Sequence, residues 1–516
     1  MVFSHPEARP VKHLSLYACA AVIALAPSAS AQDIPSATER MNAYLDNFSG
    51  VVGPGFAVVV VTEDDVLINR VEGVRNAATG APLTGDTPIY IASQTKAYMG
   101  LVAASLDERG ILPLDTPIDT WLPGAEWPDN IDPANYTLRD LLSHQVPFEN
   151  GTITFLEAYV MRVDPADYAN LISQHSEPRE AGFQYDNLGY NVYAAILENA
   201  TGRSWQDWLD EIIFDPMGMD HTSARTSDFS LDDLSWSHIW QGDELGWAAI
   251  TPKTDGMMQS AGGLVTSPND MITWLQLQLR GSAPAAGITD SMVTAAQTSY
   301  AETGMEDGRN PYEMSCSGYT LGWNVCEYQG FEVHIHGGGY TGARTGMLFS
   351  PDAGVGIAVF GNSDNMTGWW TSATVRMFFQ FLAGDETADQ MVEVRRQFYA
   401  DRTARLLEYR QTAIAERNAE DYWEGWAWMP DSVELARYAG EYVSDGIPAP
   451  AIIRVNGNGL VFELGDLVSN LRPARPDLFG GTGEDPFDGA ARFEFQRDAG
   501  GEIVSFTWND ETFVRR

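Results

Sequence analysis

The first 385 residues contain strand patterns near both ends and helical patterns between them. Of the features of this sequence, this order restricts the possible folds most strongly. Residues 56–61 are apolar and β-branched, and the acidic turn 63–65 leads into a second strand at 66–74, so an antiparallel hairpin is predicted. Strand patterns return at 319–328, at 331–336, and in a hairpin of 346–349 with 355–360. We expect one antiparallel sheet built from both ends of this section, with helices packed around it, in an α+β fold.

The interval from about 110 to 330 is mostly helical, because short helical patterns alternate there with loops rich in proline and glycine. A helix is expected to begin near Ser93, since Met99, Val102 and Leu106 are apolar at helical spacing and Gly110 follows as a stop signal. A further helix is expected from about 371 to 382. The first domain, residues 32–385, is therefore predicted to pair a sheet with a mostly helical subdomain.

The remaining chain is expected to form two parts. Residues 386–430 contain a charged helical pattern that acts as a linker. Residues 431–516 contain short strand patterns separated by Gly, Asp and Pro, which predicts a small all-β, barrel-like domain.

The first 31 residues have the features of a signal peptide. Arg9 and Lys12 precede an apolar run from Leu14 to Ala26, and the small residues 29–31 end the segment. We expect cleavage before Gln32, a periplasmic or secreted protein, and no integral membrane span once the signal is removed. Lipidation at Cys19 is a minor alternative.

The chain is strongly acidic, with 71 Asp and Glu against 31 Lys and Arg and a net charge of −40. Such a surface disfavours nucleic acids and anionic membranes as partners. A small-molecule or peptide substrate is the expected partner, oligomerisation remains possible, and no cofactor is indicated. Cys316 and Cys326 are the cysteines left after signal removal, and a structural disulfide is preferred to a metal site or a catalytic thiol.

Lysine is scarce in this sequence, which holds only Lys12, Lys96 and Lys253. Lys96 follows Ser93 by three residues, so a helix would bring the amine and the hydroxyl to one face. A buried lysine can lose its proton and activate a serine, whereas arginine stays charged. The alternative is an ordinary helix start with a solvated lysine.

Tyr185 and Asn187 form a second candidate group, within FQYDNLGYNVYAAILENATG. A phenol beside an ammonium group can transfer protons, and an amide two residues later can orient Lys96 and hold a substrate carbonyl. The alternative is a loop in which Asn187 caps the next helix.

His336, Gly337, Gly338 and Gly339 follow a strand pattern and form a third group. Three glycines allow a substrate to lie against a strand edge, and the N–H of Gly339 is a candidate oxyanion donor. His334 and His336 also alternate onto one face, but no further ligand accompanies them, so no metal site is predicted. A glycine-rich hairpin without function is the alternative.

The order and spacing of these three groups resemble the class C β-lactamase and DD-peptidase-like family of serine hydrolases. The similarity covers roughly residues 36–380 and includes TLRDLLSH, SAGGLVTSPNDM and HGGGYTGARTGMLFSPDAGVGIAVFGN. It implies the β-lactamase/penicillin-binding-protein-like fold and an acyl-enzyme mechanism.

In that mechanism Ser93 attacks a carbonyl, Lys96 and Tyr185 handle protons, and the amides of Ser93 and Gly339 bind the oxyanion. The substrate-binding residues that the resemblance implies are Asn187, His336, Gly337, Gly338 and Gly339.

One departure affects the expected substrate, because β-lactamases of this family usually carry Lys, Thr, Gly where this chain has His336, Gly337 and Gly338. The difference favours the family's D-aminopeptidases, esterases and amide hydrolases. A β-lactamase or DD-carboxypeptidase is the first alternative, and a non-catalytic binding or sensor protein is the second. Lys253 begins a similar-looking tetrapeptide, which we interpret as a chance match because no strand pattern surrounds it.

Overall fold

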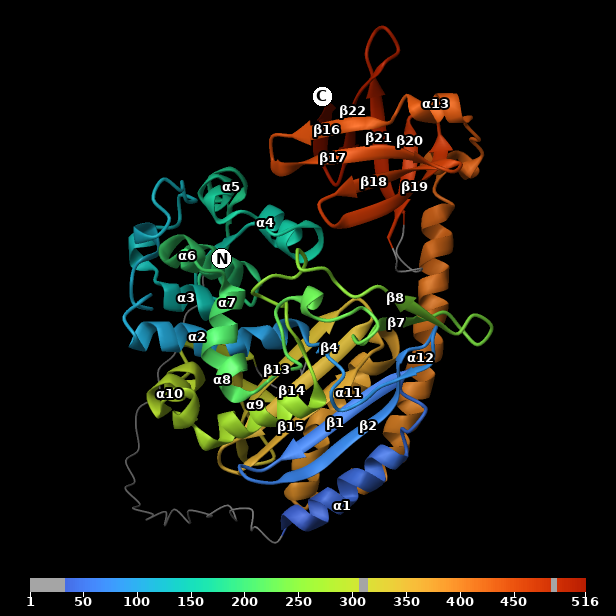
Figure 1. Ribbon diagram of the computed structural model, residues 1–516. Helices are drawn as coiled ribbons and strands as arrows, with labels where there is room; N and C mark the ends of the chain where they lie inside the picture. The colour runs from blue at the N-terminus through green and yellow to red at the C-terminus, as the bar shows by residue number, and fades with distance from the viewer. Residues whose placement is uncertain (1–32, 306–313, 484–489) are drawn as a thin grey trace, which may run out of the picture.

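The computed structural model describes residues 33–305, 314–483 and 490–516, so the predicted signal peptide at 1–31 lies outside the described residues. These residues form an α+β domain with a large antiparallel sheet, a long connecting helix, and a closed β-barrel (Figure 1). The predicted fold class is confirmed.

The large sheet has nine strands in the order β10-β11-β12-β13-β14-β15-β1-β2-β3. Because β1 pairs with both β15 and β2, the two ends of the domain meet in the middle of the sheet. The strand bounds are β1 Gly55–Val61, β2 Val66–Asn76, β3 Ala81–Pro82, β10 Ala301–Met305, β11 Ser315–Tyr319, β12 Asn324–Tyr328, β13 Phe331–Tyr340, β14 Ala343–Ser350 and β15 Val355–Gly361.

Both faces of this sheet are covered, which explains why β1 is apolar at every position. Ala57 and Val59 pack into the cluster that contains the helical subdomain, whereas Val58 and Val60 pack with α1 and α11 on the opposite face. Successive strand residues point to opposite faces, so a strand between two helical layers needs apolar residues throughout.

The helices surround the sheet as expected from the sequence. The α-helix bounds are α1 Asp33–Asp46, α2 Thr95–Glu108, α3 Leu138–Leu142, α4 Gly151–Phe155, α5 Tyr168–His175, α6 Leu188–Thr201, α7 Trp205–Leu209, α8 Asp215–Met217, α9 Pro268–Arg280, α10 Asp290–Gln297, α11 Asp364–Leu382, α12 Thr387–Asn418 and α13 Ser432–Ala436. Three two-stranded sheets accompany them: β4 Ile89–Tyr90 with β9 Val265–Thr266, β5 Phe148–Glu149 with β6 Glu177–Pro178, and β7 Ser237–Trp240 with β8 Trp247–Ile250.

Three sequence-based bounds differ from the structure. The expected strand at 319–328 is two strands, because Thr320 accepts hydrogen bonds from the N–H groups of Gly322 and Trp323 and makes a turn. The strand predicted to end at His336 continues to Tyr340, so the glycines lie inside β13. Helix α11 begins at Asp364 rather than near 371, since its first turns pack on the sheet through Trp370.

Cys316 on β11 and Cys326 on β12 are joined in a disulfide, as the sequence analysis preferred. Within the described ranges, none of the helices combines the length and the apolar character needed to cross a bilayer.

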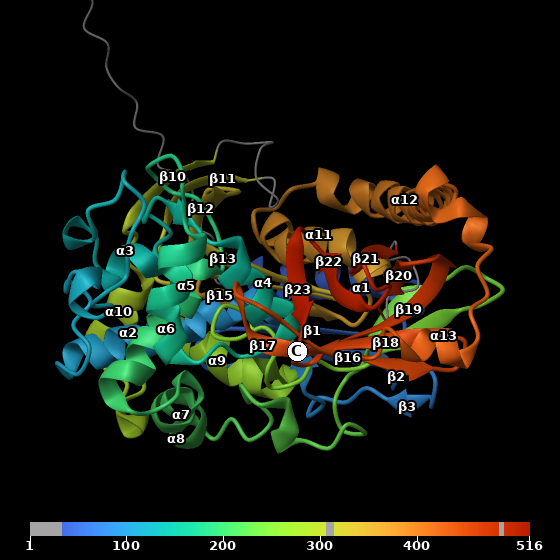
Figure 2. The ribbon, with the colours of Figure 1, turned by 90° about the horizontal axis from the view of Figure 1, so that it is seen from above.

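The barrel closes through eight antiparallel strands around an aromatic core. It lies above the sheet in Figure 1, and in Figure 2, seen from above, it lies in front of the sheet, beside α4. Its strands are β16 Gly440–Ser444, β17 Ile447–Asn456, β18 Gly459–Leu464, β19 Leu467–Arg475, β20 Leu478–Thr482, β21 Ala491–Arg497, β22 Ile503–Trp508 and β23 Glu511–Arg515.

The turn between β18 and β19 contacts the first domain directly. The Asp466 N–H donates to the carbonyl of Val160 at 2.6 Å, and the Thr254 hydroxyl donates to the Asp466 carboxylate at 2.5 Å. The Trp508 ring of β22 also packs edge-on against Phe155 of α4. The barrel is therefore attached to α4, to the segment that follows it, and to the loop between β8 and β9.

Candidate active site

Ser93 lies in a tight turn between β4 and α2. The preceding residue, Ala92, has a φ of 48°, which places a non-glycine residue in the left-handed region. Thr95 stabilises this turn, because its hydroxyl donates to the Ala92 carbonyl at 2.6 Å and accepts from the Leu264 N–H at 3.1 Å. The Ser93 side chain is thus held at the start of α2 and lines the adjoining pocket.

Lys96 is fully buried, so the alternative of a solvated lysine at a helix start does not apply. Its Nζ donates to Asn187 Oδ1 at 2.8 Å and to the Ala261 carbonyl at 2.7 Å, and lies 3.4 Å from Ser93 Oγ. Burial lowers the pKa of Lys96 from 10.5 to about 7, although the charge of Asp186 opposes this shift. Near neutral pH the amine is therefore partly unprotonated.

The neighbours of Nζ determine what the neutral amine does. The amide oxygen of Asn187 and the carbonyl oxygen of Ala261 can only accept hydrogen bonds, so they occupy both N–H groups of a neutral amine. The remaining lone pair is left for the third neighbour, the hydroxyl of Ser93. This geometry suits Lys96 to remove the Ser93 proton.

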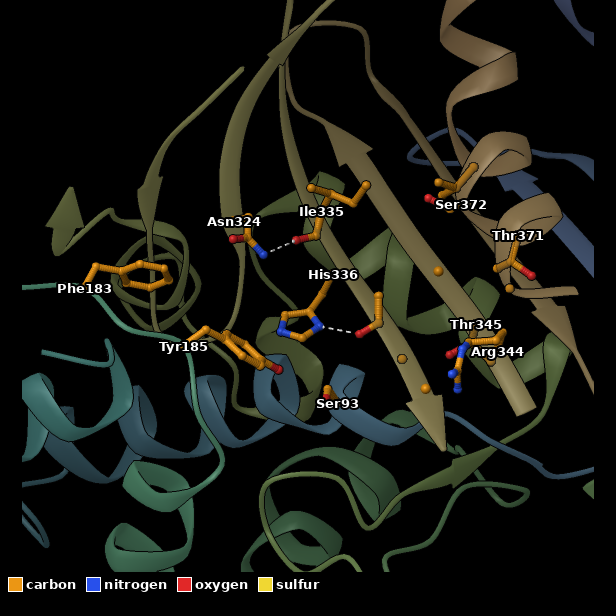
Figure 3. Close-up of a pocket in the computed structure, with 16 residues that line it drawn as sticks. Ser93, Phe183, Tyr185, Asn324, Ile335, His336, Arg344, Thr345, Thr371 and Ser372 are labelled. Atoms are coloured by element: carbon orange, nitrogen blue, oxygen red, sulfur yellow. Dashed lines mark hydrogen bonds between the residues drawn. The ribbon is translucent and has the colours of Figure 1, made fainter. Parts of the chain in front are cut away.

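Asn187 and Tyr185 belong to the loop that enters α6. Asn187 occupies the N-cap position of α6, but its side chain makes no capping hydrogen bond and instead binds Lys96. The Tyr185 side chain is 45% exposed, and the Lys96 Nζ lies 5.0 Å from its ring centroid. Figure 3 shows the phenol oxygen of Tyr185 on the side of Ser93.

Residues that the sequence analysis did not single out support this loop. His144 accepts the Asp186 N–H at its Nδ1 at 3.3 Å, its carbonyl accepts the Gln184 N–H at 3.0 Å, and its ring packs against Tyr185. The carboxylate of Asp186 pairs with Arg179 at 2.6 Å. Although burial raises the pKa of Asp186, the charge of Arg179 and the hydrogen bond from the Gly189 N–H hold it below its usual range.

No sequence signal assigned these roles, because His144 and Asp186 meet only through the folded chain. His144 has a φ of 59°, a strained backbone conformation that the residue letters do not reveal. The carbonyl of Ala261 was missed for a similar reason, since any residue type supplies a carbonyl.

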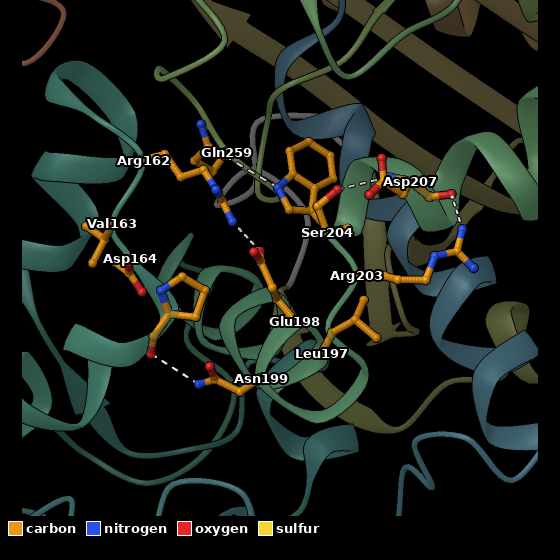
Figure 4. A network of polar contacts seen from close by, with 12 residues as sticks. Arg162, Val163, Asp164, Leu197, Glu198, Asn199, Arg203, Ser204, Asp207 and Gln259 are labelled. Atoms are coloured by element: carbon orange, nitrogen blue, oxygen red, sulfur yellow. Dashed lines mark hydrogen bonds and ion pairs between the residues drawn. The ribbon is translucent and has the colours of Figure 1, made fainter.

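The loop that carries Ala261 is fixed by contacts with several helices. The Gln259 side chain lies beside α7 and accepts from Trp205 Nε1 at 3.4 Å, while Arg162 pairs with Glu198 nearby (Figure 4). The Ser260 hydroxyl donates to the carbonyl of Tyr190 at 2.9 Å. The Ala261 carbonyl, which accepts from Lys96, therefore belongs to a segment that these hydrogen bonds hold in place.

Lys253, at the start of this loop, is buried, and its Nζ donates to the Thr254 carbonyl at 3.2 Å. Burial lowers the pKa of Lys253 to about 8, against the charges of Asp255 and Asp466. The tetrapeptide that begins at Lys253, residues 253–256, follows β8 and belongs to no strand.

The third group lies on β13, next to the Ser93 turn. Asn324, the first residue of β12, pairs with Ile335, so of the described strands only β14 pairs with β13 from His336 onward. A Cβ at Gly338 would lie 2.1 Å from the carbonyl oxygen of Ile91. Glycine is therefore required there for β13 to approach the Ser93 turn so closely.

His336 is a neutral side chain in this site. Its burial, with a contribution from the Lys96 charge, lowers the pKa of His336 to about 3. Its Nδ1 lies 2.7 Å from the Gly337 carbonyl, which can only accept, so Nδ1 carries the proton. Nε2 then accepts from the Tyr319 hydroxyl at 3.3 Å.

The predicted residues thus surround one pocket of about 490 Å³, and Figure 3 shows the side chains that line it. Ser93, Tyr185, His336 and the three glycines line it directly, while Lys96 and Asn187 lie behind Ser93. Among the residues that the structure describes, no three His, Cys, Asp or Glu side chains gather as potential metal ligands.

Comparison with known proteins identifies similar sequences and structures. The model of the Beta-lactamase family matches residues 45–374, more than half of the chain. The unguisins hydrolase ungD' of Aspergillus campestris (strain IBT 28561) is 26% identical over 339 residues, which cover 62% of this chain and 61% of that protein. The chain therefore spans less than two thirds of that relative's length.

Two solved structures share the fold. The octameric penicillin-binding protein homologue from Pyrococcus abyssi has a TM-score of 0.56 at 17% identity, over 92% of this chain and 99% of that chain. The D-amino acid amidase from Ochrobactrum anthropi SV3, complexed with D-phenylalanine, has a TM-score of 0.54 at 19% identity, over 68% of this chain and 100% of that chain.

Proposed function

Because this chain belongs to the Beta-lactamase family, we propose that it is an exported serine hydrolase that forms an acyl-enzyme at Ser93 and cleaves a peptide, amide or ester bond. The observation that carries the proposal is the environment of Lys96. The two N–H groups of the neutral amine are used by Asn187 and Ala261, which can only accept, so its lone pair faces the Ser93 hydroxyl. The pKa of about 7 makes this neutral form available near neutral pH.

The first half of the reaction forms the acyl-enzyme. The proton of Ser93 passes to Lys96 as Oγ bonds to the substrate carbonyl carbon, and the N–H groups of Ser93 and Gly339 stabilise the resulting oxyanion. Collapse of this intermediate breaks the bond to the leaving amine or alcohol, which takes a proton from Tyr185. Lys96 reprotonates Tyr185.

In the second half, water attacks the acyl carbon and gives a proton to the Tyr185–Lys96 pair. The carbon–oxygen bond to Ser93 breaks, and the serine hydroxyl is restored. Asn187 keeps Lys96 oriented, and His336 with the three glycines borders the bound substrate.

The neutral His336 favours amide, peptide or ester substrates over β-lactams. With a pKa of about 3, it carries no positive charge at neutral pH and offers a substrate carboxylate no ion pair. The D-amino acid amidase that shares the fold and the unguisins hydrolase that is similar in sequence also support a substrate other than a β-lactam. β-Lactamase or DD-carboxypeptidase activity is the alternative, and prompt nitrocefin hydrolysis or stable labelling by fluorescent penicillin would favour it.

The decisive experiment is labelling with a fluorescent fluorophosphonate, with Ser93→Ala as the blank. We expect labelling of the wild type and none of the variant, together with turnover in a panel of D-aminoacyl anilides, D-Ala-D-Ala peptides and short acyl esters. Absence of labelling in both proteins contradicts the proposal. Labelling without turnover of the whole panel supports the alternative of a sensor protein.

Export is part of the same proposal and has its own test. The charged and apolar pattern of residues 1–31 supports it. N-terminal sequencing of protein recovered outside the cytoplasm is expected to begin at Gln32. An uncleaved cytoplasmic product contradicts it.

A further inference from the structure

A row of aromatic side chains runs from the end of β13 to the barrel. Its members are Tyr340 of β13, Tyr159 of the helical turn Leu156–Val160, Phe155 of α4 and Trp508 of β22. The ring centroids of Tyr340 and Tyr159 lie 5.8 Å apart, and those of Tyr159 and Phe155 also lie 5.8 Å apart. The Phe155 and Trp508 centroids are separated by 5.7 Å, where α4 lies beside the barrel (Figure 2). We call these four side chains the aromatic row.

The middle of the aromatic row is open to solvent. Tyr159 is 44% exposed and Phe155 is partly buried, whereas Trp508 is buried in the barrel. The Tyr159 ring is stacked on the Tyr340 ring with an interplanar angle of 18°, and the Tyr340 hydroxyl donates to the Ala158 carbonyl at 3.4 Å. Packing therefore holds the Tyr159 ring in place, and nearly half of its surface remains available to another group.

The aromatic row begins where the Ser93 pocket ends. Gly339 is the last residue of β13 that lines the pocket, and Tyr340 follows it directly. The Tyr340 ring also packs edge-on against Tyr90, three residues before Ser93. From His336 onward β14 is the only described strand that pairs with β13, so the other edge of β13 can take an extended chain as a further strand. A chain that follows this edge out of the pocket reaches the aromatic row.

The position of Tyr185 determines which part of a substrate points toward the row. In the proposed function Tyr185 protonates the leaving atom, and its ring lies beside His336, with 6.0 Å between the ring centroids. The substrate carbonyl oxygen is bound three residues further along β13, at the N–H of Gly339, and Tyr340 comes next. The leaving group therefore lies at the His336 end of this stretch, and the acyl part is directed toward Tyr340 and Tyr159.

We propose that the aromatic row is a subsite for the acyl part of the substrate, and that it binds an aromatic ring held at a distance from the scissile carbonyl. The inference rests on the proposed function, because it uses Tyr185 and Gly339 to orient the substrate. Tyr340 lies between Gly339 and Tyr159, so a small group attached directly to the carbonyl does not reach Tyr159. Acyl groups that combine a long chain with a terminal ring should benefit from the row, and acetyl should not.

The test varies the acyl group while the leaving group stays p-nitrophenol. The p-nitrophenyl esters of acetic, heptanoic, 3-phenylpropanoic and 7-phenylheptanoic acids are hydrolysed by the wild type and by Tyr159→Ala. An aromatic pair contributes ~0.5–1.5 kcal/mol beyond the area that it buries, which corresponds to a ratio of about 2 to 12. We expect Tyr159→Ala to lower kcat/KM for the 7-phenylheptanoyl ester at least about threefold, and for the acetyl ester less than about 1.5-fold.

Matched variants separate the effect of the ring from an effect on folding. Tyr409→Ala makes the same change at a tyrosine of α12 that is 71% exposed, and it should leave the whole series unchanged. Tyr159→Phe keeps the ring and should keep the wild-type values. Tyr159→Gln removes the ring but keeps a long side chain, and it should act like Tyr159→Ala if that variant folds poorly. Equal hydrolysis of the 7-phenylheptanoyl ester by the wild type and the folded variants without the ring overturns the proposal.

A second series distinguishes the two sides of the scissile bond. Ethyl acetate and 7-phenylheptyl acetate place the variable group on the leaving alcohol, and we expect the wild type and Tyr159→Ala to hydrolyse each of them at equal rates in a pH-stat. A loss confined to 7-phenylheptyl acetate assigns the row to the leaving group and overturns the proposal. Equal losses for the acetyl and 7-phenylheptanoyl esters of p-nitrophenol overturn it as well, because they indicate a general effect on the Ser93 site.

Binding of 7-phenylheptanamide tests the aromatic row without turnover. Calorimetry on Ser93→Ala and on the double variant Ser93→Ala/Tyr159→Ala should give a Kd at least about threefold weaker in the double variant. If fluorophosphonate labelling and ester hydrolysis both fail, the proposed function falls while this measurement still decides about the row. Equal Kd values in the two proteins refute the row as a subsite.

Discussion

The substitution Asn187→Asp tests the role assigned to Lys96. It places a carboxylate at the position of the amide oxygen that lies 2.8 Å from Nζ, with nearly the same size and shape. A negative charge this close to an amine favours the ammonium form, and pairs at such distances shift a pKa by about 1–3 units. The pKa of Lys96 should therefore rise from about 7 to a value near 8–10.

The size of the activity change follows from the fraction of neutral amine. At pH 7 about half of the wild-type Lys96 is neutral, whereas a pKa of 8 to 10 leaves roughly 10% to 0.1% neutral. The rate of Ser93 acylation at pH 7 should thus fall about 5- to 500-fold. Since only protonation is affected, the rate should recover as the pH rises through the new pKa.

The assay is the pH dependence of kcat/KM for p-nitrophenyl acetate, with the rate of fluorophosphonate labelling as a second readout of the same step. Asn199→Asp is the control, because it adds the same charge to an exposed position of α6, about 18 Å further along the helix. An unshifted midpoint in Asn187→Asp, or an equal shift in Asn199→Asp, would refute the role of Lys96 as the base.

Three further predictions concern the supports of the site. Gly338→Ala should abolish Ser93 labelling, because its Cβ would lie 2.1 Å from the Ile91 carbonyl and push β13 away; labelling at the wild-type rate contradicts this. Asp466→Ala should lower the free energy of unfolding by about 1 kcal/mol through loss of the Thr254 hydrogen bond, whereas Asp466→Asn, which keeps an acceptor, should cost less in urea denaturation. Replacing Cys316 and Cys326 with Ser removes a link across ten residues and should cost about 2–3 kcal/mol in the same assay, with the wild-type rate of fluorophosphonate labelling kept.

The sequence determined the fold class and singled out the candidate reactive groups. Periodicity predicted the β1–β2 hairpin and the sheet built from both ends of the domain, because burial on both faces forces apolar residues along β1. The spacing of Ser93 and Lys96 placed both on one helical face, and the scarcity of lysine marked the amine.

The tertiary structure alone decided what surrounds those groups. The carbonyl of Ala261, the ring of His144 and the close approach of Gly338 to Ile91 bring chain segments far from Ser93 in sequence to the site. Backbone carbonyls exist at every residue and carry no residue-type signal, and the space left by a missing side chain depends on which element packs opposite it. The pKa of Lys96 likewise comes from burial, a property of the packed molecule, so the sequence identifies Lys96 as a candidate base while the fold sets its protonation.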